Sequence, residues 1–175
     1  RRHQQIGVSI SVEVTRAYVM FGNSGNTSFN MSALSAPGSG FYIDGIVGDA
    51  TGWSLSVAND INGDGLSDVI IGSPTASPGG RASAGQVYVV YGKTDNATVS
   101  LSGLTAGTST SGFVINGQAA SDYAGYSVSS VGDVNGDGLS DIIVGAPKVT
   151  GLGANNPGSG VGASSTVGSG VWETE

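Results

Sequence analysis

The chain has 175 residues, of which only 11 % are charged, and it contains 31 glycines and no cysteine. The net charge is −7 and the six Lys and Arg residues form no basic cluster beyond the adjacent Arg1 and Arg2, so we expect no nucleic-acid partner. The absence of cysteine excludes a disulfide frame and a thiolate site. No stretch approaches the roughly 20 apolar residues of a membrane span, so we expect no membrane insertion within this chain.

The first 51 residues form two segments, of which only the second resembles later parts of the sequence. Residues 1–15 match no later part of the sequence and lack the unbroken apolar core, about 7–15 residues long, of a secretory signal. We interpret them as an atypical N-terminal segment. Residues 16–51 contain "AYVMFG" (17–22) and "GFYIDG" (40–45), two apolar runs that predict the outer strands of a partial unit.

Residues 52–117 predict one complete unit of four antiparallel strands. The expected strands are 52–58, 68–73, 86–91 and 112–116. The second strand, "DVIIGSP", is a continuous β-branched run, which is typical of a strand buried on both faces. Gly-, Pro- and Asp-rich turns separate the strands, and a long connection (93–111) precedes the last one. Such a four-stranded unit, repeated with short loops, is typical of a propeller blade.

A repeat then becomes visible. "DINGDGLSDVIIGSP" (60–74) and "DVNGDGLSDIIVGAP" (133–147) are identical at 11 of 15 positions and lie 73 residues apart. "GWSLSVAND" and "GYSVSSVGD" have the same spacing, so residues 118–148 predict the inner half of a next blade, with strands at 125–131 and 141–146. Residues 149–175 predict a Gly/Ser-rich loop and an atypical C-terminus.

The expected fold class is therefore all-β, with four-stranded antiparallel blades in an incomplete propeller. One whole and two partial blades do not close a propeller, which typically needs 4–8 blades. We accordingly expect this chain to be a fragment.

The duplicated acidic phrase predicts a cation site. Oxygen-bearing side chains stand at alternate positions, which point inward when a loop wraps an ion, and a backbone carbonyl from Leu can add a further oxygen. Three carboxylates without nitrogen or sulfur favour a hard cation, and calcium is favoured over magnesium, which demands a more rigid octahedron. We therefore expect two calcium sites. Their candidate ligands are Asp60, Asn62, Asp64, Leu66 and Asp68 in the first loop and Asp133, Asn135, Asp137, Leu139 and Asp141 in the second.

Other interpretations of these residues stay open. Each loop could be an Asp/Asn/Gly-rich hairpin turn that merely caps two strands. It is not an EF-hand, because position 12 is Ile71 or Val144 instead of Glu, and strands are expected on both sides. Asp49 and Asp122 stand at equivalent positions before each first strand and could be turn caps or groups that support the metal ligands from behind; we favour turn caps. Trp53 and Tyr126 are interpreted as core aromatics between blades.

The combination of acidic loop, G-[AS]-P and "GQVYVVYG" resembles FG-GAP repeats, over about residues 16–148. These are the blades of integrin α-subunit β-propellers and of bacterial multi-repeat surface proteins, and the bacterial proteins look closer. The resemblance implies that the acidic loop joins the first two strands of a blade and binds calcium on one face of the propeller.

The expected function is a non-enzymatic, calcium-binding propeller fragment of an extracellular or cell-surface adhesion or interaction protein. Its partner would be a protein or cell-surface ligand, and no RGD-type signature identifies it. No G-x-S-x-G nucleophile motif is present. The alternatives are an accessory propeller of a secreted hydrolase such as a phospholipase-like enzyme, and a structural spacer in a long repeat array.

Overall fold

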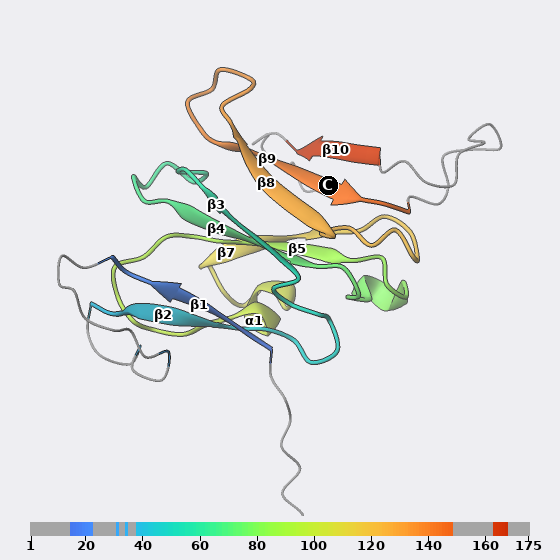
Figure 1. The fold of residues 1–175 in the computed structure, drawn as a ribbon, viewed down its shortest axis with the longest axis horizontal. Coiled ribbons are helices and arrows are strands. Elements are labelled where there is room, and N and C mark those ends of the chain that lie inside the picture. The colour runs from blue at the N-terminus through green and yellow to red at the C-terminus, as the bar shows by residue number, and fades with distance from the viewer. Residues whose placement is uncertain (1–14, 23–30, 32–33, 35–37, 149–162, 168–175) are drawn as a thin grey trace, which may run out of the picture.

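The computed structural model describes residues 15–22, 31, 34, 38–148 and 163–167. Three β-sheets lie one above another, as Figure 1 shows, with little helix between them. The strands are β1 (Arg16–Met20), β2 (Gly40–Asp44), β3 (Ser54–Ala58), β4 (Asp68–Ser73), β5 (Gln86–Val90), β6 (Val99–Ser100), β7 (Gly112–Asn116), β8 (Ser127–Gly132), β9 (Asp141–Ala146) and β10 (Ala163–Val167). The helical elements are a 3-10 turn, η2 (Pro78–Gly80), and one short helix, α1 (Leu101–Thr105).

The central sheet has the order β3-β4-β5-β7 with every neighbouring pair antiparallel. All four strands expected between residues 52 and 117 are therefore present, and the all-β, antiparallel fold class is confirmed. We call this sheet the middle blade. None of the described helices is long and apolar enough to cross a membrane.

The first sheet has the order β1-β2-β6, and its third strand was not expected from the sequence. Strand β6 and helix α1 both lie inside residues 93–111, which were expected to be a plain connection. β6 pairs in parallel with β2, and Val99, Leu101 and Leu104 are buried against the first sheet and the middle blade. Burial of these apolar side chains gives the connection its structure.

The third sheet has the order β8-β9-β10. The expectation of a Gly/Ser-rich loop within residues 149–175 is wrong for β10, which pairs antiparallel with β9. Ala163 lies opposite Ala146, as Gln86 lies opposite the repeat-equivalent Ser73. The free backbone groups at the edge of β9 explain why a segment of such small residues forms a strand. The expected atypical C-terminus lies outside the described residues.

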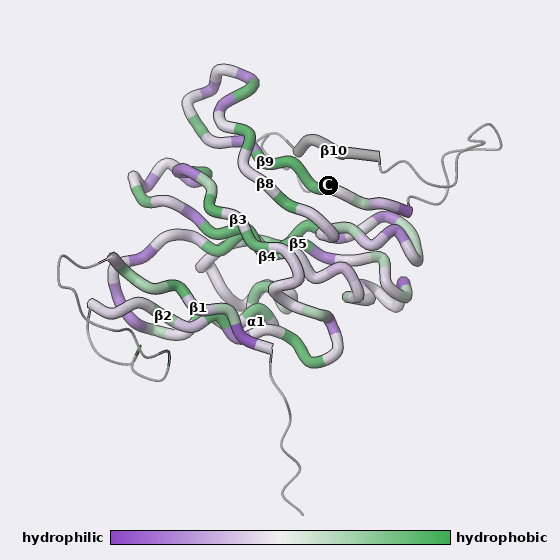
Figure 2. The backbone as a smooth tube through the Cα atoms, viewed as in Figure 1, coloured by the Kyte–Doolittle hydropathy of each residue, from purple (hydrophilic) through white to green (hydrophobic). Residues whose placement is uncertain are grey.

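The middle blade is buried on both faces. Ile71, Tyr88 and Val90 pack toward the first sheet, while Ile70, Val87 and Val89 pack toward the third. Figure 2 shows the resulting hydrophobic colour along β4, β5 and β9. This arrangement explains why β4 and β5 are continuous apolar runs, because alternate residues enter two different cores.

Backbones approach closely where the middle blade meets the third sheet. A Cβ atom on Gly72 would lie 2.0 Å from the Gly125 carbonyl oxygen, a distance that no real side chain tolerates. The Ser54 hydroxyl donates a hydrogen bond of 2.8 Å to this same carbonyl. The glycine of G-[AS]-P therefore serves to let the next sheet approach.

Candidate metal-binding loops

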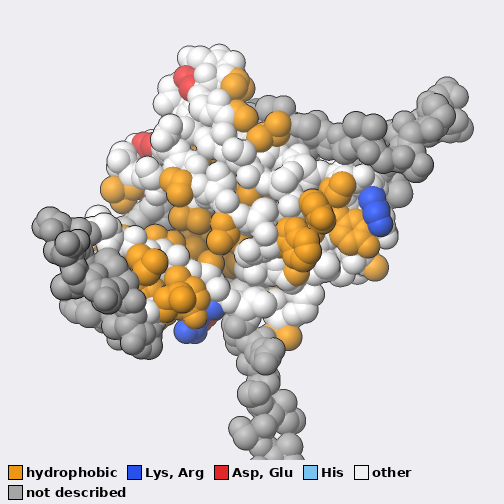
Figure 3. All heavy atoms as spheres, viewed as in Figure 1, with side chains coloured by type: hydrophobic (Ala, Val, Ile, Leu, Met, Phe, Trp, Pro, Cys, Tyr) orange, Lys and Arg blue, Asp and Glu red, His pale blue; other side chains and the backbone are white. Residues whose placement is uncertain are grey.

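The two acidic loops are the hairpin connections β3–β4 and β8–β9, which project on the same side of the stacked sheets (Figure 1). They lie next to each other, because the Ser140 amide in the second loop donates to the Asp60 carbonyl in the first, at 3.0 Å. Figure 3 shows acidic atoms at this edge of an otherwise weakly charged face. The fold thus gathers both copies of the acidic phrase at one edge.

Asp60 organises the first loop. One carboxylate oxygen accepts from the amides of Gly63 (2.6 Å) and Asp64 (3.1 Å), and the other accepts from Gly65 (2.7 Å). Gly65 has a φ of 85°, in the left-handed region that favours glycine. The carboxylate therefore holds the tight turn that the G-D-G sequence makes.

Asn62 and Asp64, both exposed, contact each other within this turn. The Asn62 side-chain oxygen accepts from the Asp64 amide at 3.1 Å, and its Nδ2 donates to the Asp64 carboxylate at 2.9 Å. The Asp64 amide is thus shared by oxygens of Asp60 and Asn62. Three of the candidate ligands are therefore already in hydrogen-bond contact with one another.

Asp68 occupies a different environment, at the start of β4. It is fully buried, and its two oxygens accept from the amides of Ile61 and Gly92, each at 2.8 Å. Gly92 follows β5, so the carboxylate ties the loop to the end of that strand. Sequence reasoning missed the role of Gly92, because a backbone amide leaves no signature in the residue type.

The second loop repeats the first. Asp133 accepts from the amides of Gly136, Asp137 and Gly138, at 2.7, 3.1 and 2.8 Å. Asn135 contacts Asp137 through the same two hydrogen bonds, 2.9 and 3.0 Å long. Asp141 is buried and accepts from Val134, as Asp68 accepts from Ile61. Two copies of the sequence have thus produced the same local hydrogen-bond network.

The carboxylates of the first loop differ in electrostatics. The backbone amides, led by that of Gly65, lower the pKa of Asp60. Burial raises the pKa of Asp68; the nearby negative charges of Asp64 and Asp60 raise it further, and the amides of Gly92 and Ile61 oppose this. Negative charge is therefore favoured at Asp60, which the loop amides surround, and disfavoured at the buried Asp68.

The candidate ligands are not drawn together into a finished coordination shell. Among the described residues, no three Asp, Glu or His side chains converge in the geometry of a metal cluster. The side chains instead satisfy loop amides, and Leu66 and Leu139 donate their own amides to Asp64 and Asp137. Their carbonyls stay proposed ligands.

Two further expectations can be compared with the structure. Asp122 is buried and accepts from the Ala119 amide at 2.8 Å, as a turn cap does. Trp53 and Tyr126 lie against each other, with ring centroids 5.5 Å apart, across the boundary between the middle blade and the third sheet. They are 58 % and 48 % exposed, so the expectation of core aromatics is wrong. Each residue directly precedes the first strand of its sheet, and the two exposed rings pack against each other.

Comparison with known proteins identifies the repeat. The FG-GAP repeat model matches residues 51–90 and 124–166. Mouse phosphatidylinositol-glycan-specific phospholipase D is 30 % identical over 126 residues, covering 72 % of this chain and 14 % of that protein. Fruit fly integrin alpha-PS5 is 34 % identical over 105 residues, covering 58 % of this chain and 9 % of the integrin. Mouse integrin alpha-M is 37 % identical over 95 residues, covering 54 % of this chain and 7 % of the integrin.

This chain thus spans about one seventh or less of the length of these relatives. The second matched segment extends to residue 166 and so includes most of β10. The matched segments begin just before β3 and β8 and contain both acidic loops, as the resemblance implied. With its repeated antiparallel sheets, the chain belongs to the FG-GAP repeat family and consists of β-propeller blades.

Proposed function

We propose that this chain is a calcium-stabilised set of propeller blades from an extracellular or cell-surface protein that acts in adhesion or interaction, without catalysis. The observation that carries the calcium proposal is the duplicated loop. In both copies the equivalent Asn and Asp side chains make the same hydrogen bonds. A hairpin that only needed capping would not require three carboxylates in each loop.

The donor set fits calcium. Asp60, Asn62, Asp64 and Asp68 bring carboxylate and amide oxygens, and Leu66 can add a carbonyl, so a hard cation with six to eight oxygen ligands suits the loop. Neither nitrogen nor sulfur ligands stand nearby in the repeat. The corresponding residues of the second loop offer the same set. On binding, some of the side-chain oxygens that now accept hydrogen bonds from loop amides would turn toward the ion.

The physical role of the ion would be to stabilise the folded state. A cation favours the ionised form of the carboxylates and offsets both the burial of Asp68 and the repulsion from its neighbours. An ion that binds the folded but not the unfolded chain raises the free energy of unfolding in proportion to the logarithm of its concentration.

Calorimetric titration of the metal-stripped chain with calcium tests this proposal. We expect two saturable sites and a rise in melting temperature. Both should be lost in the double variant Asp64→Asn/Asp137→Asn, which keeps side-chain size. Asp95→Asn is the matched control, because Asp95 is an exposed carboxylate outside both loops. A folded protein that shows neither heat nor thermal shift would contradict calcium binding.

The proposed adhesion or interaction role is supported by the integrin alpha relatives. The partner would be a protein or a cell-surface ligand. A pull-down with the immobilised chain, in calcium and then in EDTA, tests this role. Recovery of a saturable, calcium-dependent ligand from surface-labelled cells is expected. Equal recovery by the double variant would contradict a role for the loops.

A second candidate is an accessory propeller attached to a secreted hydrolase. The similarity to the phospholipase D, which covers more of this chain than the integrin similarities do, favours it. A catalytic domain in the same polypeptide would distinguish this candidate. A spacer in a long repeat array would instead bind no ligand in the pull-down.

A further inference from the structure

The end of the second acidic loop is covered, whereas the equivalent end of the first is not. Ser140 is 7 % exposed, and its amide donates to the Asp60 carbonyl at 3.0 Å. Ser67 stands at the same position of the first loop. It is exposed, and its amide has no such carbonyl partner in the described part of the chain. The contact between the loops thus joins the end of the second to the start of the first.

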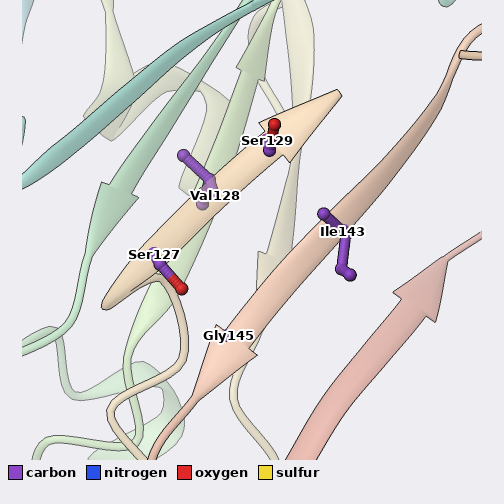
Figure 4. Close-up of a pocket in the computed structure, with 5 residues that line it drawn as sticks. All are labelled: Ser127, Val128, Ser129, Ile143 and Gly145. Carbon is purple, nitrogen blue, oxygen red and sulfur yellow. The ribbon is translucent and has the colours of Figure 1, made fainter. Parts of the chain in front are cut away.

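A side chain and a shared core add to this contact. A Cβ atom on Gly63 would lie 3.7 Å from Leu139 Cδ2, an ordinary van der Waals distance, so the Leu139 side chain lies beside the first loop. Figure 4 shows β8 and β9, the strands that carry the second loop, with Val128 pointing toward the middle blade. Val128 and Ile142 pack in the core that also contains Ile61 of the first loop. The two loops are therefore held against each other by the packing beneath them.

A continuous chain of hydrogen bonds connects candidate ligands of the two loops. It begins at the peptide unit between Leu139 and Ser140, whose carbonyl is a candidate ligand and whose amide donates to the Asp60 carbonyl. It continues through the peptide unit between Asp60 and Ile61, whose amide donates to the Asp68 carboxylate at 2.8 Å. Ile61 and Asp68 are both buried, so this last hydrogen bond is shielded from water. Only two peptide units thus separate a candidate ligand of the second loop from one of the first.

Such a chain transmits the state of one loop to the other. Peptide units in a row polarise one another, because charge drawn toward the oxygen of a peptide makes its N–H a stronger donor. With the Leu139 carbonyl bound to a cation, each hydrogen bond in the chain is strengthened, including the one that Asp68 accepts. Both peptide units are also fixed, so less conformational freedom remains to be lost when the first loop binds its own ion. Both effects favour binding at one loop when the other is filled.

Repulsion between two bound cations opposes this coupling. The side chains that surround each turn are exposed, as Asn62, Asp64, Asn135 and Asp137 show, so solvent and salt reach both loops. Salt weakens the repulsion between exposed charges, with a screening length of about 8 Å at ~0.15 M. The hydrogen bonds act at contact distance and one of them is buried, so salt weakens them much less. The link through the peptide units therefore prevails at this ionic strength.

We propose that the two loops bind calcium with positive cooperativity, coupled through the peptide units that join Leu139 to Ser140 and Asp60 to Ile61. The inference rests on the proposed calcium binding and adds to it a coupling between the sites. Filling one loop raises the affinity of the other by about 5-fold, at the lower end of the ~5–150-fold range of couplings between sites in proteins. The coupling is reciprocal, so the factor is the same whichever loop fills first.

Calorimetric titration of three metal-stripped chains with calcium, at ~0.15 M salt, measures the coupling. Asp64→Asn leaves only the second loop able to bind, and Asp137→Asn leaves only the first. The two variants therefore give the association constant of each loop alone. We expect the overall constant for two ions in the unmodified chain to exceed the product of these single-loop constants by about 5-fold.

Ser140→Pro tests the link itself, because proline has no amide to donate to the Asp60 carbonyl. Ser67→Pro is the matched control: each proline stands between a leucine and a buried aspartate, but only the Ser140 amide donates across the loops. The excess should vanish with Ser140→Pro and persist with Ser67→Pro. No excess in the unmodified chain, or an undiminished excess with Ser140→Pro, would overturn the coupling alone. A folded chain that binds no calcium would overturn the proposed function with it.

Amide NMR on the Asp64→Asn chain gives a second measurement if a proline variant does not fold. Calcium then fills only the second loop. We expect the Ile61 amide proton to move downfield, because its hydrogen bond to Asp68 strengthens. The Ala97 amide is the control, since it donates to the exposed Asp95 outside both loops and should not move. An Ile61 amide that stays in place while the second loop fills contradicts the coupling.

Discussion

Burial between sheets can be measured by a matched pair of substitutions at Ile70 and Ile143. These residues occupy the same position of the repeat, in β4 and β9. Ile70 is 0 % exposed because the third sheet covers it, whereas Ile143 is half-buried. The two sites therefore differ mainly in whether a further sheet lies against them.

The expected cost follows from this difference. Ile→Ala removes about three carbon atoms, worth ~2.4 kcal/mol when fully buried at ~0.8 kcal/mol per CH₂. At Ile70 a cavity also remains, which brings the expected loss of unfolding free energy to about 3–4 kcal/mol. At Ile143 water fills the space, and about 1 kcal/mol is expected from the partial burial.

Urea denaturation followed by circular dichroism measures both costs on the same chain. We expect the midpoint of Ile70→Ala to fall well below that of Ile143→Ala at an unchanged slope, which shows that stability and not compactness has changed. In melting temperature the Ile70 variant should lose about 6–16 °C. Equal losses for the two variants would refute the view that the third sheet seals the middle blade.

Three other substitutions test separate features. Gly72→Ala should destabilise the chain far more than Gly145→Ala in thermal melts, because its Cβ meets a backbone carbonyl, whereas that of Gly145 meets chiefly a serine hydroxyl that can rotate; similar losses would contradict the close-approach argument. Asp68→Asn should cost about 1–3 kcal/mol even in EDTA, because an amide cannot accept both the Ile61 and Gly92 hydrogen bonds; urea unfolding without calcium checks this, and an unchanged midpoint would exclude a structural role. Burial raises the pKa of Tyr88, so the folded chain holds the phenolic proton to higher pH than the unfolded chain does. The free energy of unfolding should therefore keep its full contribution from Tyr88 below pH ~10 and fall above it. Tyr88→Phe should weaken this alkaline loss in melting temperatures measured over a pH series, and an identical pH profile would show that Tyr88 is not its source.

The sequence by itself determined the strands and the two acidic loops, because both are encoded locally. β-branched runs bounded by Gly, Pro and Asp place β3, β4, β5 and β7 within two residues of their expected bounds. The spacing of Asp60, Asn62 and Asp64 likewise places them in one turn, where the Asn62 and Asp64 side chains contact each other and the Asp60 carboxylate accepts from loop amides. Their role as metal ligands stays a prediction. The duplication then extended the same reasoning to the third sheet.

Only the tertiary structure decided the features that depend on contacts across the chain. Strand β10 forms because its backbone pairs with the edge of β9, and α1 forms where Leu101 and Leu104 are buried in the hydrophobic core. The exposure of Trp53 and the hydrogen bond from Gly92 to Asp68 depend on which segment lies beside them. Residue types determine which strand or turn a segment forms, because these preferences are local. Which face of a sheet is buried depends on other sheets that are distant in the sequence, so only the tertiary structure decides it.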